Sequence, residues 1–190
     1  MITSFDQIFA LLKSKPKKRL VAAYANDAHT IGAVSMAIDE NIIDATLVGD
    51  ESIIKKVCLE ENIDFHKFNI VQESDETKAA SKAVEFVSKG EGDILMKGLC
   101  STDKYMRAIL NKEFGLLPPK GILSHVSLMK CSYFDRILIF GDIAVIPAPD
   151  LNQKVAICNY LINTAKALGI EKPKVAVIAS TEQMTPSMSA

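Results

Sequence analysis

The stretch Asp93–Arg107, DILMKGLCSTDKYMR, decides the fold that the sequence predicts. Its apolar run, Ile94–Met96, ends at Lys97 and Gly98, and a Ser-Thr-Asp segment then opens a helical pattern. This order is typical of a buried strand, a tight turn and the start of a helix in an α/β protein. Backbone N–H groups at a helix start, together with lysine and arginine, favour an anion. The stretch therefore predicts a site for a phosphate-bearing ligand. The alternative is a solvated lysine, a helix cap and a surface arginine.

The same alternation of strand and helix signals continues on both sides of this stretch. Short runs that are apolar throughout predict buried strands over residues 20–25, 45–48, 68–71 and 94–96. Amphipathic segments predict helices over residues 5–12, 27–42, 51–61, 75–87 and 102–111. Because strands of this kind need helices on both faces, we expect a three-layer α/β fold with a parallel sheet. In such sheets, ligands bind at the carboxyl ends of the strands, where Lys97 and Gly98 lie.

The pattern changes after Pro118 and Pro119. The remaining segments predict a β-hairpin over 122–129 and 136–140, a helix over 151–168 capped by Asp150, and a buried strand over 175–179. We therefore expect a first α/β domain over residues 1–147 and the start of a second over 148–190.

Composition excludes several classes of partner. The 190 residues carry a net charge of −1, so the whole chain has no electrostatic footprint for nucleic acid. No apolar run reaches the roughly 18 residues that a membrane span needs. The four cysteines lack metal-like spacing and predict free thiols in a reducing cytoplasm. The basic cluster Lys13–Arg19 predicts a solvated helix end, with a polyanion site as the alternative.

The chain resembles the phosphate acetyltransferase and butyryltransferase family, most closely its butyryltransferase branch. The segments that carry the resemblance are Ala45–Asp50, Asp93–Leu99 with Thr102 and Arg107, Ala108–Lys112, Leu123–Val126, Asp142, Ala148–Leu151 with Gln153 and Lys154, Ala167–Ile170, and Pro173–Val177. Two positions depart from the family pattern: Ile146 stands where members usually have asparagine, and Ser187 where they have a basic residue. The resemblance implies a two-domain fold like that of isocitrate and isopropylmalate dehydrogenases. Family chains continue further, so the second domain is expected to be incomplete here.

This resemblance also implies an activity. The family moves a short-chain acyl group between coenzyme A and inorganic phosphate, with no metal and with coenzyme A as a substrate rather than a cofactor. The expected partners are acyl-CoA and phosphate, in a cytoplasmic homo-oligomer such as a dimer. The alternative is an inactive relative that only binds a phosphate-bearing ligand or pairs with another subunit. A dinucleotide-binding dehydrogenase is disfavoured, because Asn26-Asp27-Ala28-His29 follows the first strand and GxGxxG is absent.

Seven residues form the expected site. The resemblance implies catalytic roles for Asp142 and Ser124, and substrate binding by Lys97, Gly98, Thr102, Arg107 and His125. By position, Arg107 resembles the family's phosphate-contacting arginine, Thr102 and Ser124 resemble hydroxyl donors near the acyl phosphate, and Asp142 resembles the acidic residue at the cleft edge. Structural alternatives stay open: Thr102 as a helix cap, Asp142 as a turn residue, and His125 as a buried histidine rather than a base. Glu182 and Pro186 match the family's loop after the last predicted strand.

Overall fold

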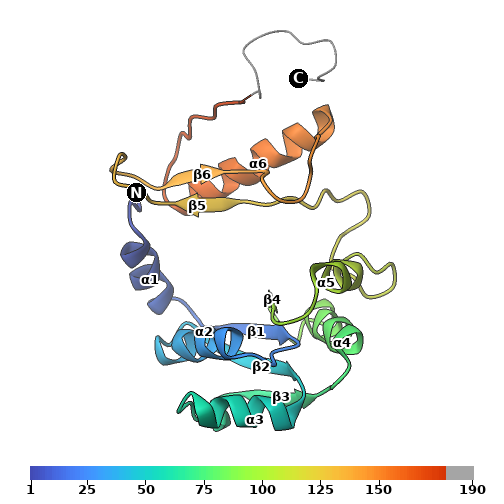
Figure 1. Cartoon of the computed structure of the whole chain (residues 1–190). Coiled ribbons are helices and arrows are strands. Elements are labelled where there is room, and N and C mark those ends of the chain that lie inside the picture. Colours follow the sequence, from blue (N-terminus) through green and yellow to red (C-terminus); the bar gives the residue numbers. More distant parts are fainter. Residues whose placement is uncertain (179–190) are drawn as a thin grey trace. The chain divides into compact units, whose positions relative to one another are not determined.

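The computed structural model describes residues 1–178 (Figure 1). By its contacts the chain divides into two compact units, which are described one at a time. One unit is Phe9–Gly121, and the other joins Met1–Ile8 to the chain from Ile122 onward. The boundary between two folding domains that the sequence predicts after residue 147 stays a prediction.

The unit Phe9–Gly121 is built on a four-stranded parallel sheet, which confirms the predicted α/β class. Its strands are β1 (Lys18–Ala23), β2 (Ile43–Gly49), β3 (Asn69–Gln72) and β4 (Ile94–Lys97). They lie in the order β3-β2-β1-β4. In this register Ala23 of β1 lies opposite Val48 of β2 on one side and Lys97 of β4 on the other. The carboxyl ends of these three strands therefore share one edge.

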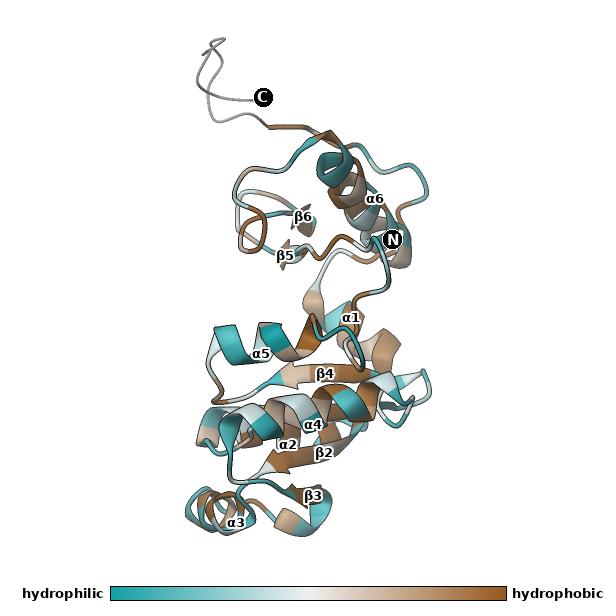
Figure 2. Cartoon of the chain, turned by 90° about the vertical axis from the view of Figure 1, so that its right-hand side faces the viewer, coloured by the Kyte–Doolittle hydropathy of each residue, from teal (hydrophilic) through white to brown (hydrophobic). Residues whose placement is uncertain are grey.

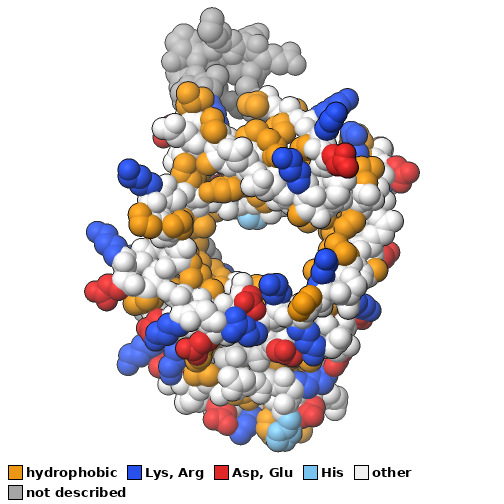
Figure 3. All heavy atoms as spheres, turned by 180° about the vertical axis from the view of Figure 1, so that it is seen from behind, with side chains coloured by type: hydrophobic (Ala, Val, Ile, Leu, Met, Phe, Trp, Pro, Cys, Tyr) orange, Lys and Arg blue, Asp and Glu red, His pale blue; other side chains and the backbone are white. Residues whose placement is uncertain are grey.

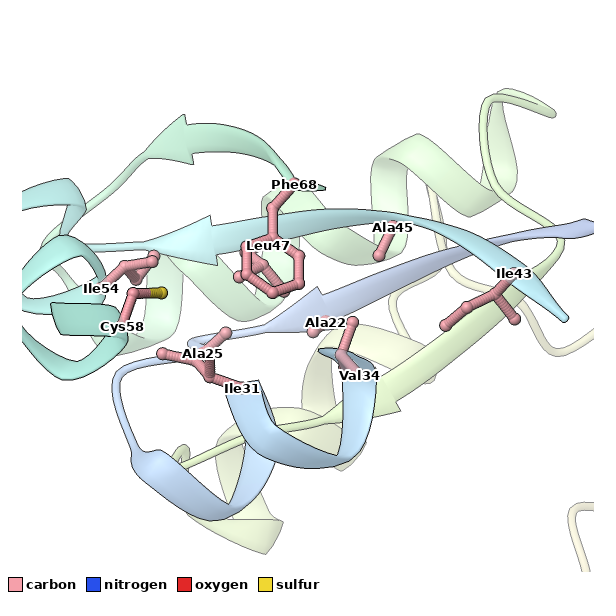
Figure 4. Packing of buried hydrophobic residues seen from close by; sticks show 10 residues of the cluster. All are labelled: Ala22, Ala25, Ile31, Val34, Ile43, Ala45, Leu47, Ile54, Cys58 and Phe68. Atoms are coloured by element: carbon pink, nitrogen blue, oxygen red, sulfur yellow. The ribbon is translucent and has the colours of Figure 1, made fainter. Parts of the chain in front are cut away.

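Helices cover both faces of this sheet, as the apolar strands require. The helices of this unit are α2 (Ala28–Asp39), α3 (Glu51–Glu60), the short 3-10 helix η1 (Phe65–Lys67), α4 (Glu76–Ser88) and α5 (Thr102–Ile109). Helix α1 (Phe5–Lys13) has no buried residue and is divided between the two units. Ala22 of β1 packs with residues of α2 and α3, whereas its neighbour Val21 packs with α4. Figure 4 shows the first of these clusters, and Figure 2 shows the apolar strands between more polar helices. Successive side chains of β1 point to opposite faces of the sheet, so helices pack on both faces and the unit has three layers.

Aspartate side chains begin the helices that follow the first three strands. Asp27, Asp50 and Asp75 each accept a hydrogen bond from a backbone N–H in the first turn of α2, α3 and α4. Such caps satisfy amides that would otherwise lack a partner. These helix starts are therefore occupied by the chain's own carboxylates.

The second unit contains the predicted hairpin and the predicted long helix. Strand β5 (Ser127–Met129) pairs with β6 (Leu138–Phe140) in antiparallel fashion, over shorter ranges than the apolar runs suggested. Helix α6 (Leu151–Ala167) begins at a capping box formed by Asp150 and Gln153. The Tyr160 hydroxyl donates to the Ile122 carbonyl oxygen at 2.7 Å. This bond ties α6 to the segment that leads into β5.

The strand predicted over residues 175–179 is wrong for its described part. Residues 175–178 have no strand pairing, and Val177 and Ile178 are 85% and 89% exposed. A strand needs a hydrogen-bonded neighbour, and no segment in residues 1–178 supplies one for this run. Ala179, Glu182, Pro186 and Ser187 lie outside the described residues.

Candidate functional site

The order of the strands creates a switch point between β1 and β4. The chain proceeds from β1 outward through β2 to β3, and then returns to the opposite side of β1 to form β4. In open α/β sheets, ligands bind outside the carboxyl ends of the strands at such a reversal. Lys97 ends β4 at this place and Gly98 follows it directly, as the sequence predicted.

Gly98 lies against the backbone of β1. Its N–H donates to the Ala23 carbonyl oxygen at 2.9 Å, and the N–H of Leu99 donates to the Tyr24 carbonyl oxygen at 2.9 Å. A Cβ atom at residue 98 would lie 2.6 Å from the Tyr24 oxygen and 2.7 Å from the Ala23 oxygen. Glycine is therefore required for the close approach of these two loops.

Cys100 in the same loop is a packing residue. Its side chain is buried, and Sγ lies 3.6 Å from the Ala23 carbonyl oxygen. Burial raises the pKa of the Cys100 thiol, although nearby Lys97 acts in the opposite direction. A raised pKa disfavours the thiolate, so this cysteine lacks the environment of a nucleophile.

Helix α5 starts at a cluster that includes a residue from α4. Ser101 is the N-cap, and its Oγ accepts from the Lys104 N–H at 3.4 Å. The Ser101 N–H donates to Oε1 of Glu76 at 2.6 Å, and the Lys104 ammonium pairs with Oε2 of the same carboxylate. These two bonds, from Lys104 and then from Ser101, lower the pKa of Glu76. An internal carboxylate thus occupies groups at the helix start that the sequence suggested for phosphate.

The cap of α5 and the role of Glu76 differ from what the sequence predicted. Thr102 is the first residue of α5 and is exposed, so the cap is Ser101 rather than Thr102. The serine directly before the helical pattern was a signal that could have identified the cap. Glu76 left no signal, because it reaches Ser101 from 25 residues away.

The two predicted cations of this segment have different surroundings. Arg107 lies in the last turn of α5, where Nε is 2.9 Å from Oδ2 of Asp103 and the side chain is 79% exposed. It lies about 7.5 Å along the axis from the start of the helix at Thr102, at 1.5 Å per residue. Lys97 is exposed and has no carboxylate within ion-pair distance among residues 1–178. Lys97 is therefore the cation of this segment with the most freedom to meet an anion.

In the second unit, Asp142 gathers four hydrogen bonds. Oδ2 accepts from the Ser124 hydroxyl at 2.9 Å and from the His125 N–H at 3.3 Å. Oδ1 accepts from the N–H groups of Ala144 at 2.7 Å and Val145 at 2.8 Å. Burial would raise the pKa of Asp142, but these hydrogen bonds outweigh it and lower the pKa to about 2. The carboxylate is therefore ionised at neutral pH and poorly suited to take up a proton.

Ser124 and His125 are fixed by this carboxylate. The Ser124 hydroxyl has a single proton, which it donates to Asp142, so only its lone pairs face other partners. His125 is half-buried. A Cβ atom at Gly141 would lie 2.2 Å from the His125 carbonyl oxygen, so the two backbones are in close contact.

The structure thus brings the seven predicted residues into two groups. Lys97, Gly98, Thr102 and Arg107 follow one another along β4 and α5, in the unit Phe9–Gly121. Ser124, His125 and Asp142 form one hydrogen-bonded cluster in the other unit. The joining of these groups into one site stays a prediction.

The basic cluster Lys13–Arg19 is partly neutralised by carboxylates. Basic and acidic side chains are interspersed on the face drawn in Figure 3, and three cations of the basic cluster pair with carboxylates elsewhere in the chain: Lys13 with Glu40, Lys17 with Asp44, and Arg19 with Asp93. The Arg19 pair holds the pKa of Asp93 well below its usual range. Residues 1–178 contain no group of three or more potential metal ligands, and none of their helices has the length and apolarity of a membrane span.

Comparison with known proteins identifies the class. The parallel sheet with its switch point defines an α/β protein of the open-sheet type, in which ligands commonly bind at the strand ends. The chain belongs to the phosphate acetyl/butaryl transferase family, whose profile matches residues 3–82 and 75–190.

Individual relatives extend this finding. The chain is 43% identical over 188 residues to a phosphate butyryltransferase of Clostridium acetobutylicum, covering 99% of this chain and 62% of that protein. It is 36% identical over 183 residues to a phosphate acetyltransferase of Thermotoga maritima, covering 96% of this chain and 61% of that protein. The crystal structure of a branched-chain phosphotransacylase from Enterococcus faecalis V583 superposes with a TM-score of 0.71 at 26% identity, over 90% of this chain and 59% of that one. The chain therefore spans about three fifths of the length of these proteins.

Proposed function

We propose that this chain takes part in acyl transfer between coenzyme A and inorganic phosphate: acyl-CoA and phosphate give an acyl phosphate and coenzyme A. The observation that carries the proposal is the 43% identity to a phosphate butyryltransferase, which extends over 99% of the chain and so includes both groups of site residues. The family profile supports the same reaction class.

The acyl group is expected to be short but longer than acetyl. Identity to the butyryltransferase, 43%, exceeds identity to the acetyltransferase, 36%. The superposed solved structure is that of a branched-chain phosphotransacylase. These comparisons favour butyryl-CoA as the first substrate to test.

The residues divide the chemistry between charge and orientation. Lys97 and Arg107 would attract phosphate, because charge-assisted hydrogen bonds from lysine and arginine are the strong ones. Thr102, exposed at the start of α5, would donate its hydroxyl proton, and Gly98 would let the loop lie close to β1. Asp142 would orient Ser124 and the backbone of His125 rather than act as a base, since all four of its hydrogen bonds are internal.

The proposal also covers cofactor use, cellular location and oligomeric state. Coenzyme A and phosphate act as substrates, and no further cofactor is expected. A cytoplasmic location and a homodimer belong to the proposal as well.

Thiol release from butyryl-CoA tests the function. The 190-residue chain should release free thiol only when phosphate is present, and arsenate should substitute for phosphate. A chain that binds phosphate without any release would instead be the binding-only relative. Release by a longer product of the same gene, but not by this chain, would assign the reaction to more than these residues.

A further inference from the structure

The imidazole of His125 has one enclosed ring nitrogen that lacks a partner. Nδ1 is buried and makes no hydrogen bond to any residue in the described part of the chain. Nε2 is not buried in this way. The two nitrogens of this ring therefore meet different surroundings.

The backbone of His125 is held on both sides. The His125 N–H donates to Oδ2 of Asp142 at 3.3 Å, and the His125 carbonyl oxygen lies against Gly141. Asp142 is itself fixed by two further amides, those of Ala144 and Val145. The imidazole is therefore attached to a stretch of backbone that is fixed on both sides.

This environment selects one tautomer. In a neutral imidazole, one nitrogen is a donor and the other an acceptor. A proton on Nδ1 would be a buried donor without an acceptor, and orphaned buried N–H groups are rarer than under-satisfied acceptors. The proton therefore belongs on Nε2, the nitrogen that can reach solvent or a ligand.

We infer that His125 is a neutral hydrogen-bond donor through Nε2–H, and that it is a catalytic residue which donates this bond to the acyl carbonyl oxygen. The second part rests on the proposed function. The neighbouring Ser124 cannot take this role as arranged, because its only hydroxyl proton is donated to Asp142. A neutral donor suits a carbonyl oxygen that gains charge during the reaction.

The step balances without proton transfer to His125. A phosphate oxygen forms a bond to the acyl carbon, and the carbonyl π electrons move onto the oxygen. This oxyanion then collapses, the C–S bond breaks, and the electron pair leaves on the sulfur of coenzyme A. The thiolate takes up the proton that the phosphate loses. The Nε2–H bond to the carbonyl oxygen strengthens as that oxygen becomes charged.

Nitrogen NMR of the 15N-labelled chain tests the tautomer independently of activity. The ring nitrogens of His125 should give an unprotonated signal for Nδ1 and a protonated signal for Nε2. His29 and His66 are exposed, and their averaged signals serve as internal references. A protonated Nδ1, or averaged signals at His125 like those of the two references, would overturn the inference.

Two substitutions test the catalytic role. The glutamine side-chain nitrogen can take the place of Nε2, whereas the asparagine nitrogen can only take that of Nδ1. We expect H125Q to keep kcat for thiol release within about fivefold and H125N to lower it by about 100-fold, as for loss of an oxyanion donor. The exposed His29 provides the control H29Q, which should match the wild type.

Two further outcomes of these experiments would overturn the donor role or the proposed function. Equal loss in H125Q and H125N, with disappearance of the acidic limb of the pH profile, would identify a base and overturn the donor role. No phosphate-dependent release by the wild-type chain would overturn the proposed function and the catalytic role together, while the NMR result would still decide the tautomer.

Discussion

The Ser124 hydroxyl donates to Oδ2 of Asp142 at 2.9 Å, so the two residues expected to be catalytic are already partners of each other. This bond changes what each can contribute. Ser124 presents lone pairs rather than a proton, and Asp142 is an ionised acceptor rather than a base. The cluster in this unit therefore orients groups, and His125 is its remaining donor.

Replacement of Asp142 by asparagine should remove an acid-sensitive part of the stability. The pKa of Asp142 is lowered to about 2 in the folded chain, below the unfolded value of about 3.9. A depressed pKa contributes stability that is present above the unfolded value and is lost as pH falls through the folded one. For this half-buried group we expect about 1–2 kcal/mol, lost between about pH 4 and pH 2.

Urea unfolding of the wild type and D142N across that pH range provides the measurement. The wild type should lose its advantage over D142N toward pH 2. A difference between the two proteins that stays constant from pH 5 to pH 2 would contradict the assigned hydrogen bonds.

Replacement of Gly98 by alanine should destabilise the unit Phe9–Gly121. The new Cβ would lie 2.6 Å from the Tyr24 oxygen, so the loop must move away from β1. Overpacking of this kind costs about 1–3 kcal/mol. Gly32 in α2 is the matched control, because its Cβ would meet nothing within 4 Å and alanine favours a helix. In urea unfolding, the free energy of unfolding of G98A should be lower than that of the wild type, and that of G32A should be equal or higher. The reverse order would contradict the close contact between Gly98 and β1.

Replacement of Arg107 by alanine should weaken phosphate binding and leave the stability of the fold almost unchanged. The Arg107–Asp103 pair is exposed and spaced by four residues on a helix, so its loss should change stability by at most about 0.5 kcal/mol. If Arg107 contacts phosphate, its loss should weaken phosphate binding by about 1.5–3 kcal/mol. Calorimetric titration with phosphate, beside an unfolding curve, measures both. Unchanged affinity would remove Arg107 from the site, and R107K should recover only part of a loss.

Replacement of Glu76 by alanine should loosen the start of α5. The carboxylate holds the Ser101 N–H and the Lys104 ammonium, and alanine can hold neither. Amide hydrogen exchange at Ser101 should therefore become several-fold faster, while amides within β1 and β2 keep their rates. E85A is the control on the same helix, where Glu85 pairs with Lys89. If the Ser101 amide exchanged equally slowly in both variants, the bridge from α4 to α5 would not contribute to its protection.

Local patterns in the sequence were enough for the sheet and its helices. Each of the strands β1 to β4 overlaps one of the short apolar runs, and the period and caps of the segments between them placed the helices within a few residues. The strand predicted over residues 175–179 was wrong for its described part. An apolar run becomes a strand only when a neighbouring strand pairs with it, and the run alone does not show whether such a neighbour exists. Glu76 was missed for the same reason: its partner Ser101 lies on another element. The Ser124–Asp142 bond joins residues 18 apart in the chain. The sequence therefore predicted both residues as members of the site but did not predict the hydrogen bond between them.

Phosphorus NMR of a mixture of butyryl-CoA, inorganic phosphate and the 190-residue chain follows the proposed acyl transfer itself. We expect a new acyl phosphate resonance that grows at the expense of phosphate, matched by an equal amount of free coenzyme A thiol. Thiol release with butyrate and no acyl phosphate, or no change in the phosphate resonance, would contradict it.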